Sequence, residues 1–316
     1  MTSFHGNAAA RAAFDAAIDS GVLHHAWLLA GPQGVGKGRF ARDAAARLLA
    51  SSAGDATGER TRALIEAGSH PDYRELARLE KEERGETRLA RSITIAQVRA
   101  LHPLFATTPS LGPRRVIVID AIDDLEREGA NALLKSLEEP PPGTVFLLVS
   151  HAPGRLLPTI RSRCRTLRFN LLDEREVREV LREQAPDLRG DELEALVRAA
   201  AGSPGRALRY AGLDLGAIDN ALTTIARTGD RANAERTRLA KALSTKAAQP
   251  RYEAFLDRAP EFIALQAPER AGDELRVVLD AYEEAQAIAG AARRLSLDAG
   301  GTVFELAGVV ARLARS

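Results

Sequence analysis

The stretch AWLLAGPQGVGKG, residues 26–38, decides the fold. Its first five residues, Ala26–Ala30, are apolar and predict a short buried strand, which a glycine-rich turn follows. A helix is predicted directly after the turn, because apolar residues then recur four apart, at Phe40, Ala44 and Leu48. A strand, a glycine-rich turn and a helix in this order predict a loop that cradles phosphate, with the helix N-terminus directed at the anion.

Five positions of this turn bear on phosphate binding, namely Gly31, Gly34, Gly36, Lys37 and Gly38. The first three glycines allow backbone N–H groups to wrap around phosphate oxygens, and Lys37 supplies positive charge. The last position departs from the motif, because a Ser or Thr normally provides a hydroxyl ligand to Mg²⁺ there. The sequence therefore predicts weak binding of ATP or ADP without hydrolysis, and a turn that binds no ligand is the alternative.

A second strand, predicted at Val116–Asp120, ends in an acid that could hold Mg²⁺ as a Walker B aspartate does. This signal is ambiguous by itself, since many parallel strands end in Asp where the sheet edge meets helix N-termini. ATPases with such a strand place a glutamate next, which polarises the attacking water, whereas here the residue is Ala121. Two separate catalytic elements are thus absent.

The first half of the chain alternates short apolar segments with amphipathic ones. Besides the two strands above, strands are predicted at Thr144–Ser150 and Thr166–Phe169. Strands that alternate with helices predict a parallel sheet covered by helices on both faces.

Start and stop signals mark several helices in this half. Residues 94–97 form a capping-box pattern, and the helix that they begin is expected to end by Pro103. Another helix is expected over Glu128–Glu139, because three prolines follow it. The polar segments 51–68 and 81–92 are expected to be solvated loops or short surface helices.

The second half is predicted to be helical. Helices are expected to begin at Asp173 and Asp191, and residues 202–204 combine a helix stop with an N-cap and a first-turn proline. Breaks farther along are expected near Gly229, Pro250, Pro260 and a turn at residues 298–301. The predicted domains are an α/β domain over residues 1–169, a small helical domain over 170–212 and an all-helical domain over 213–316.

Composition narrows the class of protein. The single cysteine, Cys164, can form neither an internal disulfide nor a CxxC zinc knuckle, and a reducing, cytoplasmic setting fits. Because 44 basic residues balance 43 acidic ones, strong attraction of the whole molecule to DNA is excluded. No segment reaches the roughly 18 apolar residues of a membrane span, and a signal peptide is not expected.

The segment 116–164 reads VIVIDAIDDLEREGANALLKSLEEPPPGTVFLLVSHAPGRLLPTIRSRC. The order of NALLKSLEEPP, an apolar strand and LLPTIRSRC resembles the clamp-loader branch of the AAA+ family. The resemblance extends to HHAWLLAGPQGVGKG and to SHPDY at residues 69–73, and it weakens after about Tyr210. It implies a RecA-like AAA+ P-loop domain, then a helical lid domain and an all-α C-terminal collar through which subunits oligomerise.

Three residues, Ser162-Arg163-Cys164, correspond to the SRC motif of this family, whose arginine reaches the nucleotide site of the neighbouring subunit. A guanidinium is always charged and forks onto phosphate oxygens, so Arg163 is the candidate catalytic residue in trans, with Ser162 and Cys164 in support. Arg206 lies near the place of a sensor arginine in ATPase relatives, so it is a weak candidate for nucleotide contact, but at a degenerate site an ordinary surface role is favoured.

An arginine finger joined to a disabled ATP site implies a stator of the delta-prime kind in the DNA polymerase III holoenzyme, which is not an ATPase by itself. The implied partners are gamma or tau and delta in a five-subunit ring, together with the sliding clamp and primer-template DNA. No cofactor is required by this interpretation. Zinc is not expected either, because the four-cysteine module of many relatives has no cysteines here.

Two alternatives stay open. The first is an ATP-hydrolysing motor of the gamma/tau kind or another active AAA+ ATPase, which turnover by the isolated chain would support. The second is a P-loop kinase for small molecules, which leaves the SRC motif and the helical C-terminal third unexplained.

Overall fold

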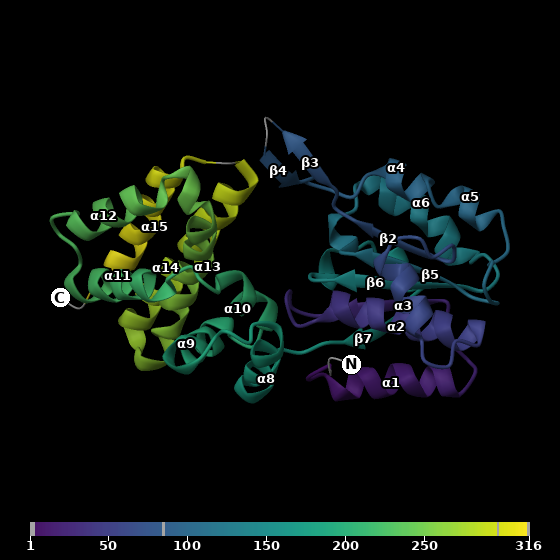
Figure 1. Cartoon of the computed structure of the whole chain (residues 1–316). Coiled ribbons are helices and arrows are strands. Elements are labelled where there is room, and N and C mark those ends of the chain that lie inside the picture. Colours follow the sequence, from purple (N-terminus) through teal and green to yellow (C-terminus); the bar gives the residue numbers. More distant parts are fainter. Residues whose placement is uncertain (1–3, 84–85, 296, 315–316) are drawn as a thin grey trace. The chain divides into compact units, whose positions relative to one another are not determined.

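Five parallel strands form one sheet in the order β2-β5-β6-β1-β7 (Figure 1). The computed structural model describes residues 4–83, 86–295 and 297–314. The strands are β1 (Ala26–Ala30), β2 (Tyr73–Ala77), β5 (Arg115–Asp120), β6 (Thr144–Ser150) and β7 (Arg165–Arg168). The predicted parallel sheet is confirmed, and its four predicted strands lie within one residue of their expected bounds.

Strand β2 was not predicted from the sequence. It lies at the edge of the sheet, beside β5, and only its Tyr73 and Leu76 are buried. The charged residues between them, Arg74 and Glu75, interrupt the apolar run that marks the inner strands. An edge strand can carry such residues because one of its sides has no strand neighbour.

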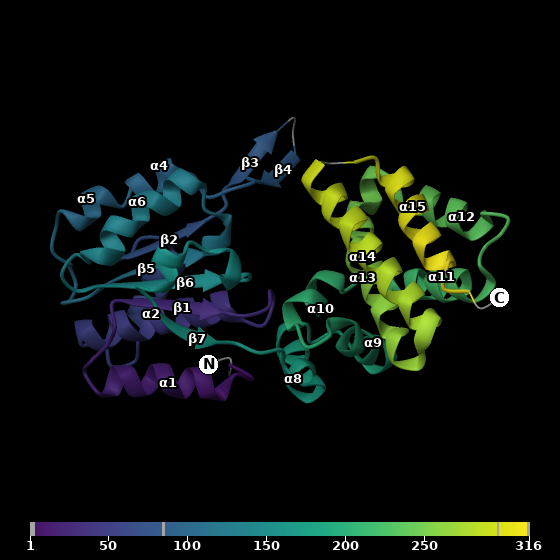
Figure 2. The same ribbon diagram turned by 180° about the vertical axis from the view of Figure 1, so that it is seen from behind.

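Helices cover both faces of the sheet (Figure 2). Those of the first 161 residues are α1 (Ala8–Asp19), α2 (Lys37–Ala53), α3 (Glu59–Glu66), α4 (Ile95–Arg99), α5 (His102–Phe105), α6 (Arg127–Glu138) and α7 (Pro158–Arg161), with short 3-10 helices at Ile122–Asp124 and Pro153–Arg155. On the α1 and α2 face, Phe14 packs edge-to-face on Trp27 at 5.0 Å and on Phe40 at 5.5 Å between ring centroids. This contact fixes both helices to β1.

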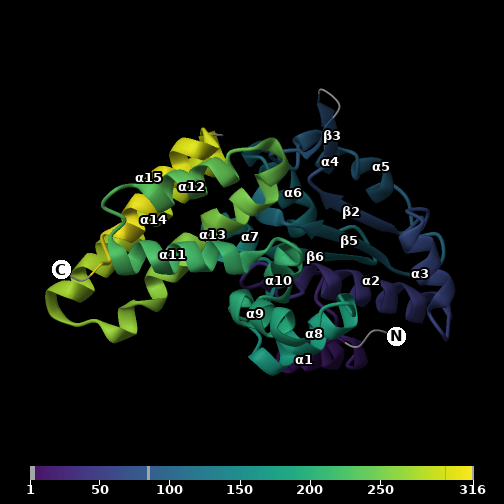
Figure 3. The same cartoon turned by 60° about the vertical axis from the view of Figure 1, so that its left-hand side comes forward.

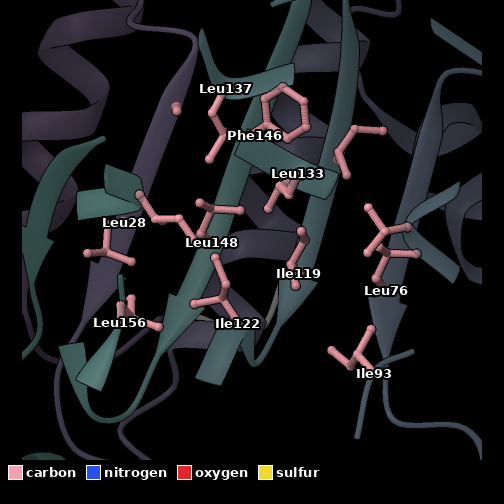
Figure 4. Packing of buried hydrophobic residues seen from close by; sticks show 14 of the residues in the cluster. Leu28, Leu76, Ile93, Ile119, Ile122, Leu133, Leu137, Phe146, Leu148 and Leu156 are labelled. Atoms are coloured by element: carbon pink, nitrogen blue, oxygen red, sulfur yellow. The ribbon is translucent and has the colours of Figure 1, made fainter. Parts of the chain in front are cut away.

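The opposite face is covered by α4, α6 and α7, and it holds an aliphatic core (Figure 4). In α6, Leu133 and Leu137 lie one turn apart and are both buried. They pack on strand residues of the same cluster, including Leu28, Ile119, Phe146 and Leu148. Full burial of each leucine contributes roughly 1.5–3 kcal/mol. As predicted, α6 stops at the three prolines.

The remaining elements are helical. They are α8 (Glu174–Gln184), α9 (Gly190–Ala200), α10 (Pro204–Tyr210), α11 (Leu215–Thr228), α12 (Ala234–Leu243), α13 (Gln249–Leu265), α14 (Gly272–Leu295) and α15 (Ala299–Ala311), with 3-10 helices at Lys246–Ala248 and Ala267–Glu269. The chain divides into two compact units, of which one ends at Leu208 and the other begins at Arg209. The three-domain division into residues 1–169, 170–212 and 213–316 stays a prediction. In the second unit, α15 packs against α11, α12, α13 and α14 (Figure 3).

Capping signals in the sequence are confirmed. The side chain of Thr94 accepts a hydrogen bond from the backbone N–H of Gln97, and the backbone N–H of Thr94 donates one to the side-chain oxygen of Gln97. Asp173 forms the same capping box with Glu176 at the start of α8. Each box satisfies two N–H groups that the first helical turn leaves without partners.

Two expectations about local structure are wrong. Within residues 81–92, where a loop or short helix was expected, β3 (Glu80–Glu83) and β4 (Glu86–Leu89) pair as an antiparallel hairpin, whose residues 84 and 85 lie outside the described part. This pairing rests on backbone hydrogen bonds, which a charged composition does not signal. The break expected at Pro260 is also absent, because α13 continues through it. Pro260 is buried beside Ala259 and Ile263, and this packing offsets the roughly 3 kcal/mol cost of a proline within a helix.

The break expected at residues 298–301 is confirmed, because α14 ends at Leu295 and α15 begins at Ala299, although residues 299–301 already belong to the first turn of α15. Asp298 is its N-cap and accepts a hydrogen bond from the N–H of Gly301 at 2.6 Å. Among the described helices, none is both long and apolar enough to cross a membrane.

Candidate functional site

The phosphate loop follows β1 and ends where α2 begins at Lys37. Gly34 adopts a φ of 81°, a left-handed conformation that side chains other than glycine disfavour. A Cβ at Gly34 would also lie 2.2 Å from Oγ of Ser203, so the loop is closely covered there. Glycine at this position is therefore required by both backbone conformation and space.

Lys37 is turned inward onto its own loop. Its side chain is buried, with 2% exposure, and Nζ donates hydrogen bonds to the carbonyl oxygens of Gly31, at 2.6 Å, and Pro32. Burial lowers the pKa of Lys37 to about 8, although the nearby carboxylate of Asp120 opposes this shift. Two of its three donors are thus used within the chain.

Asp120 and Gly38 are in direct contact. A Cβ at Gly38 would lie 2.1 Å from Oδ2 of Asp120, so this carboxylate fills the space that a Ser or Thr side chain would need. Burial raises the pKa of Asp120, and Arg42 is the largest of the influences that lower it. Asp120, the Walker B-like acid, therefore lies against Gly38, the position at which the motif has Ser or Thr.

A guanidinium supplies positive charge beside Asp120. Arg42 lies on α2, with Nη2 at 3.4 Å from Oδ2 of Asp120 and at 2.7 Å from Oε1 of Glu75. Its Nε donates to Oε2 of Glu75 at 3.1 Å, which makes that pair bidentate, and the hydroxyl of Tyr73 donates to the same carboxylate. Neither Arg42 nor Glu75 was expected from the sequence, because the contact depends on how β2 and α2 pack.

The connection after β6 is held by Asp123, which was also not expected. Its carboxylate accepts hydrogen bonds from Oγ of Ser150 at 2.9 Å, and from the backbone N–H groups of His151 at 2.6 Å and Ala152 at 3.1 Å. Burial, together with the charge of Lys37, lowers the pKa of His151, so its neutral form is favoured. The run of acids after Asp120 is the signal that could have pointed to this residue.

The helix α10 begins on the phosphate loop. Oγ of Ser203 donates to the carbonyl of Gln33 at 2.9 Å, and the N–H of Gly205 donates to the carbonyl of Gly34 at 2.9 Å. A Cβ at Gly205 would lie 2.8 Å from Cα of Gly34. Arg206 is in the same first turn, so the structure brings this candidate close to the loop.

The residues present do not fit a metal-bound nucleotide as they are arranged here. Gly38 offers no oxygen, Asp120 fills the adjoining space, and Arg42 provides the neighbouring positive charge. Within residues 4–83, 86–295 and 297–314, no group of three or more His, Cys, Asp or Glu side chains is placed to hold a metal ion.

The SRC residues lie apart from the phosphate loop, between α7 and β7. Ser162 caps α7, and its hydroxyl donates to the carbonyl of Thr159 at 3.1 Å. Arg163 places Nη2 at 2.6 Å from Oε1 of Glu138 and donates through Nη1 to the carbonyl of Thr159 at 2.7 Å. Its side chain is 32% exposed, so solvent reaches this guanidinium.

Cys164 packs against the aliphatic core. Burial raises the pKa of its thiol to about 12, so the thiol is protonated at neutral pH. A protonated thiol is a poor nucleophile, and Cys164 is placed as a packing residue that fixes the chain next to Arg163.

This sheet, with a phosphate loop after β1 and an acid at the end of β5, defines a P-loop protein of the AAA+ kind. The family model described as "DNA polymerase III, delta subunit" matches residues 6–173, which are 168 of the chain's 316 residues. The chain belongs to this family.

Curated relatives agree with the family model. DNA polymerase III subunit delta' of Pseudomonas aeruginosa is 41% identical over 191 residues, which are 60% of this chain and 56% of the relative. Subunit delta' of Escherichia coli is 37% identical over 46% of this chain and 41% of its own length. Subunit tau of Escherichia coli is 32% identical over 66% of this chain and 32% of its own length. The chain spans about half the length of the delta' relatives that it matches.

Proposed function

We propose that the chain is a delta-prime-like subunit of a DNA polymerase III clamp loader, which supplies Arg163 in trans to the ATP site of its neighbour and hydrolyses no ATP itself. One observation carries this proposal. A phosphate loop that has Gly38 in place of the Ser or Thr, with Asp120 against it, occurs in the same compact unit as an SRC arginine that is held by two contacts and open to solvent.

The chemistry of the guanidinium supports the role of Arg163. Its positive charge persists at any physiological pH, and its planar set of N–H donors matches the oxygens of a phosphoryl group. Such a group stabilises negative charge that develops during phosphoryl transfer, and arginine fingers raise kcat by roughly 10³–10⁵-fold in GTPases. Cys164 and Ser162 would hold the backbone from which Arg163 extends.

The remaining parts have proposed roles that follow the family. Residues 1–169 would be the AAA+ domain, residues 170–212 the lid, and residues 213–316 the collar through which the ring assembles. Gamma or tau and delta would complete a five-subunit ring in the cytoplasm, which loads the sliding clamp on primer-template DNA. The names of the delta', gamma and tau relatives support these partners.

The chain would require no cofactor and no zinc. Any binding of ATP or ADP would be weak, because Lys37 is already engaged by Gly31 and Pro32. The carbonyls of Gln33 and Gly34 are likewise bonded to the first turn of α10.

ATP turnover tests this division of labour. We expect none from the isolated chain, and an unchanged DNA- and clamp-stimulated rate when a reconstituted loader contains Lys37→Ala. Turnover by the isolated chain that Lys37→Ala abolishes would instead support an ATP-hydrolysing motor. Turnover that depends on a small acceptor and on no protein partner would support a kinase.

A further inference from the structure

The C-terminal end of α6 carries an acid in an unfavourable place. Glu138 is the last residue of the helix and Glu139 its C-cap, and the backbone carbonyls there already give this end a partial negative charge. A carboxylate at this end is therefore disfavoured by local electrostatics. Residues that break a local rule in this way often serve a function elsewhere in the fold.

The partner of Glu138 is Arg163, with 2.6 Å between Oε1 and Nη2. The carboxylate is 48% exposed and the guanidinium 32% exposed. An ion pair so open to water contributes little to folding stability. The ion pair instead restricts the side chain of Arg163, which would otherwise sample many rotamers.

Two acceptors on different helices fix the orientation of this guanidinium. Glu138 on α6 binds Nη2, and the carbonyl of Thr159 on α7 binds Nη1. An arginine has five N–H donors, so two strong contacts leave others for a ligand. The guanidinium of Arg163 is thus oriented, and some of its N–H donors stay available to a ligand.

The neighbouring arginines are held differently. Arg165 lies over the ring of Trp27, at 5.1 Å from the ring centroid, and Arg161 lines a cavity of about 390 Å³ beside β1 and β7. Arg163 differs from both because it is tied to an acid of α6.

We propose that Glu138 is a positioning residue for the arginine finger. Together with the carbonyl of Thr159, it holds the guanidinium of Arg163 in the orientation that meets the phosphoryl group of the neighbouring subunit. This inference rests on the proposed function, and it concerns the orientation of the Arg163 guanidinium. Orientation of a reacting group affects kcat, whereas a loss of nucleotide affinity would appear in KM.

The test compares Glu138→Ala, Glu138→Gln and Glu139→Ala in the reconstituted loader, with kcat and KM for ATP measured separately. We expect Glu138→Ala to lower kcat about fivefold and to change KM less than about twofold, because the finger loses its orientation. Glu138→Gln keeps a hydrogen-bond acceptor of the same length and should recover kcat to within about twofold of wild type. Glu139→Ala removes the adjacent exposed acid and should leave both constants unchanged.

A double variant separates positioning from a general effect on α6. In the Arg163→Ala background, Glu138→Ala should have no further effect, since there is no guanidinium left to orient. A loss of the same size in that background, or a kcat for Glu138→Ala equal to that of Glu139→Ala, would overturn the proposal. If Glu138→Ala does not fold, Glu138→Leu takes its place, because leucine also offers no acceptor to Arg163, and a kcat for it equal to that of Glu139→Ala overturns the proposal. Should Arg163→Ala itself keep the wild-type rate, the proposed finger fails and not merely its positioning.

Discussion

At the residue scale, the charged residues at the phosphate loop are paired with other groups of the same chain. Lys37 is buried and uses the carbonyls of Gly31 and Pro32, while Asp120 lies against Gly38 with Arg42 beside it. Each charge therefore has a partner inside the chain. These contacts engage Lys37 and Asp120, the two charged residues of the predicted nucleotide site.

The pKa of Lys37 predicts a pH dependence of stability. Because its folded value is lowered from 10.5 to about 8, the unfolded chain binds more protons than the folded chain between these pH values. The contribution of Lys37 to the free energy of unfolding therefore rises between pH 8 and 10.5, by on the order of 3 kcal/mol. We expect the free energy of unfolding of wild type to rise relative to Lys37→Met between pH 8 and 10.5 in urea titrations. Parallel pH curves for the two proteins would contradict the burial argument.

Gly38→Ala tests the contact with Asp120. In an open helix this change would stabilise by up to about 1 kcal/mol, but here the new Cβ would lie 2.1 Å from Oδ2 of a carboxylate that is only 22% exposed. We expect Gly38→Ala to lower the free energy of unfolding by about 1–2 kcal/mol, and to become stabilising in an Asp120→Ala background. Gly290→Ala in α14 is the control, because its nearest atom would be 3.5 Å away. Equal stabilisation by Gly38→Ala and Gly290→Ala would refute the proposed clash.

At the element scale, the first turn of α10 and the phosphate loop form one hydrogen-bonded unit. Ser203 contacts Gln33 through its side chain, and Gly205 contacts Gly34 through its backbone. Loop and helix are more than 160 residues apart in sequence, so this contact couples α10 to the sheet.

Ser203→Ala is expected to weaken this contact. The change removes a buried hydrogen bond to Gln33 and a weaker one to the N–H of Arg206, at a cost of about 1–2 kcal/mol. Hydrogen exchange of the Gly205 amide should accelerate, because its bond to Gly34 loses support. Ser52→Ala is the control, since the hydroxyl of Ser52 donates to the carbonyl of Leu49 within α2. Equal exchange at Gly205 in both variants would show that Ser203 does not hold α10 on the loop.

Elements with strong local signals could be predicted, whereas those that depend on distant contacts could not. The strands β1 and β6 are continuous apolar runs, and the capping boxes at Thr94 and Asp173 act within four residues. By contrast, β2 acquires its strand character from pairing with β5, and the hairpin of β3 and β4 has a charged sequence.

The same limit applies to the site. Its glycines, Lys37 and Asp120 follow from a local motif and are brought together by the sheet. Arg42 and Glu75 meet from different elements, and so do Glu138 and Arg163. Such pairs cannot be recognised from the sequence. Their partners are far apart along the chain, and only the packing of the elements brings them together.

At the scale of the whole molecule, the family match and the candidate site fall in the same part of the chain. The match covers residues 6–173, and both the phosphate loop and Arg163 lie inside it. The helices from Arg209 onward form a compact unit of their own, beyond the matched residues. We propose that the clamp-loader ring assembles through this second unit.

The most direct measurement is the DNA- and clamp-stimulated ATPase rate of a loader reconstituted with Arg163→Ala, against a matched loader with Arg161→Ala. Arg161 is an exposed arginine two residues away, so the comparison separates the finger from a general loss of positive charge. The account predicts a loss of about tenfold or more in kcat for Arg163→Ala, with little change for Arg161→Ala. A wild-type rate with Arg163→Ala would contradict the claim that this chain completes the ATP site of its neighbour.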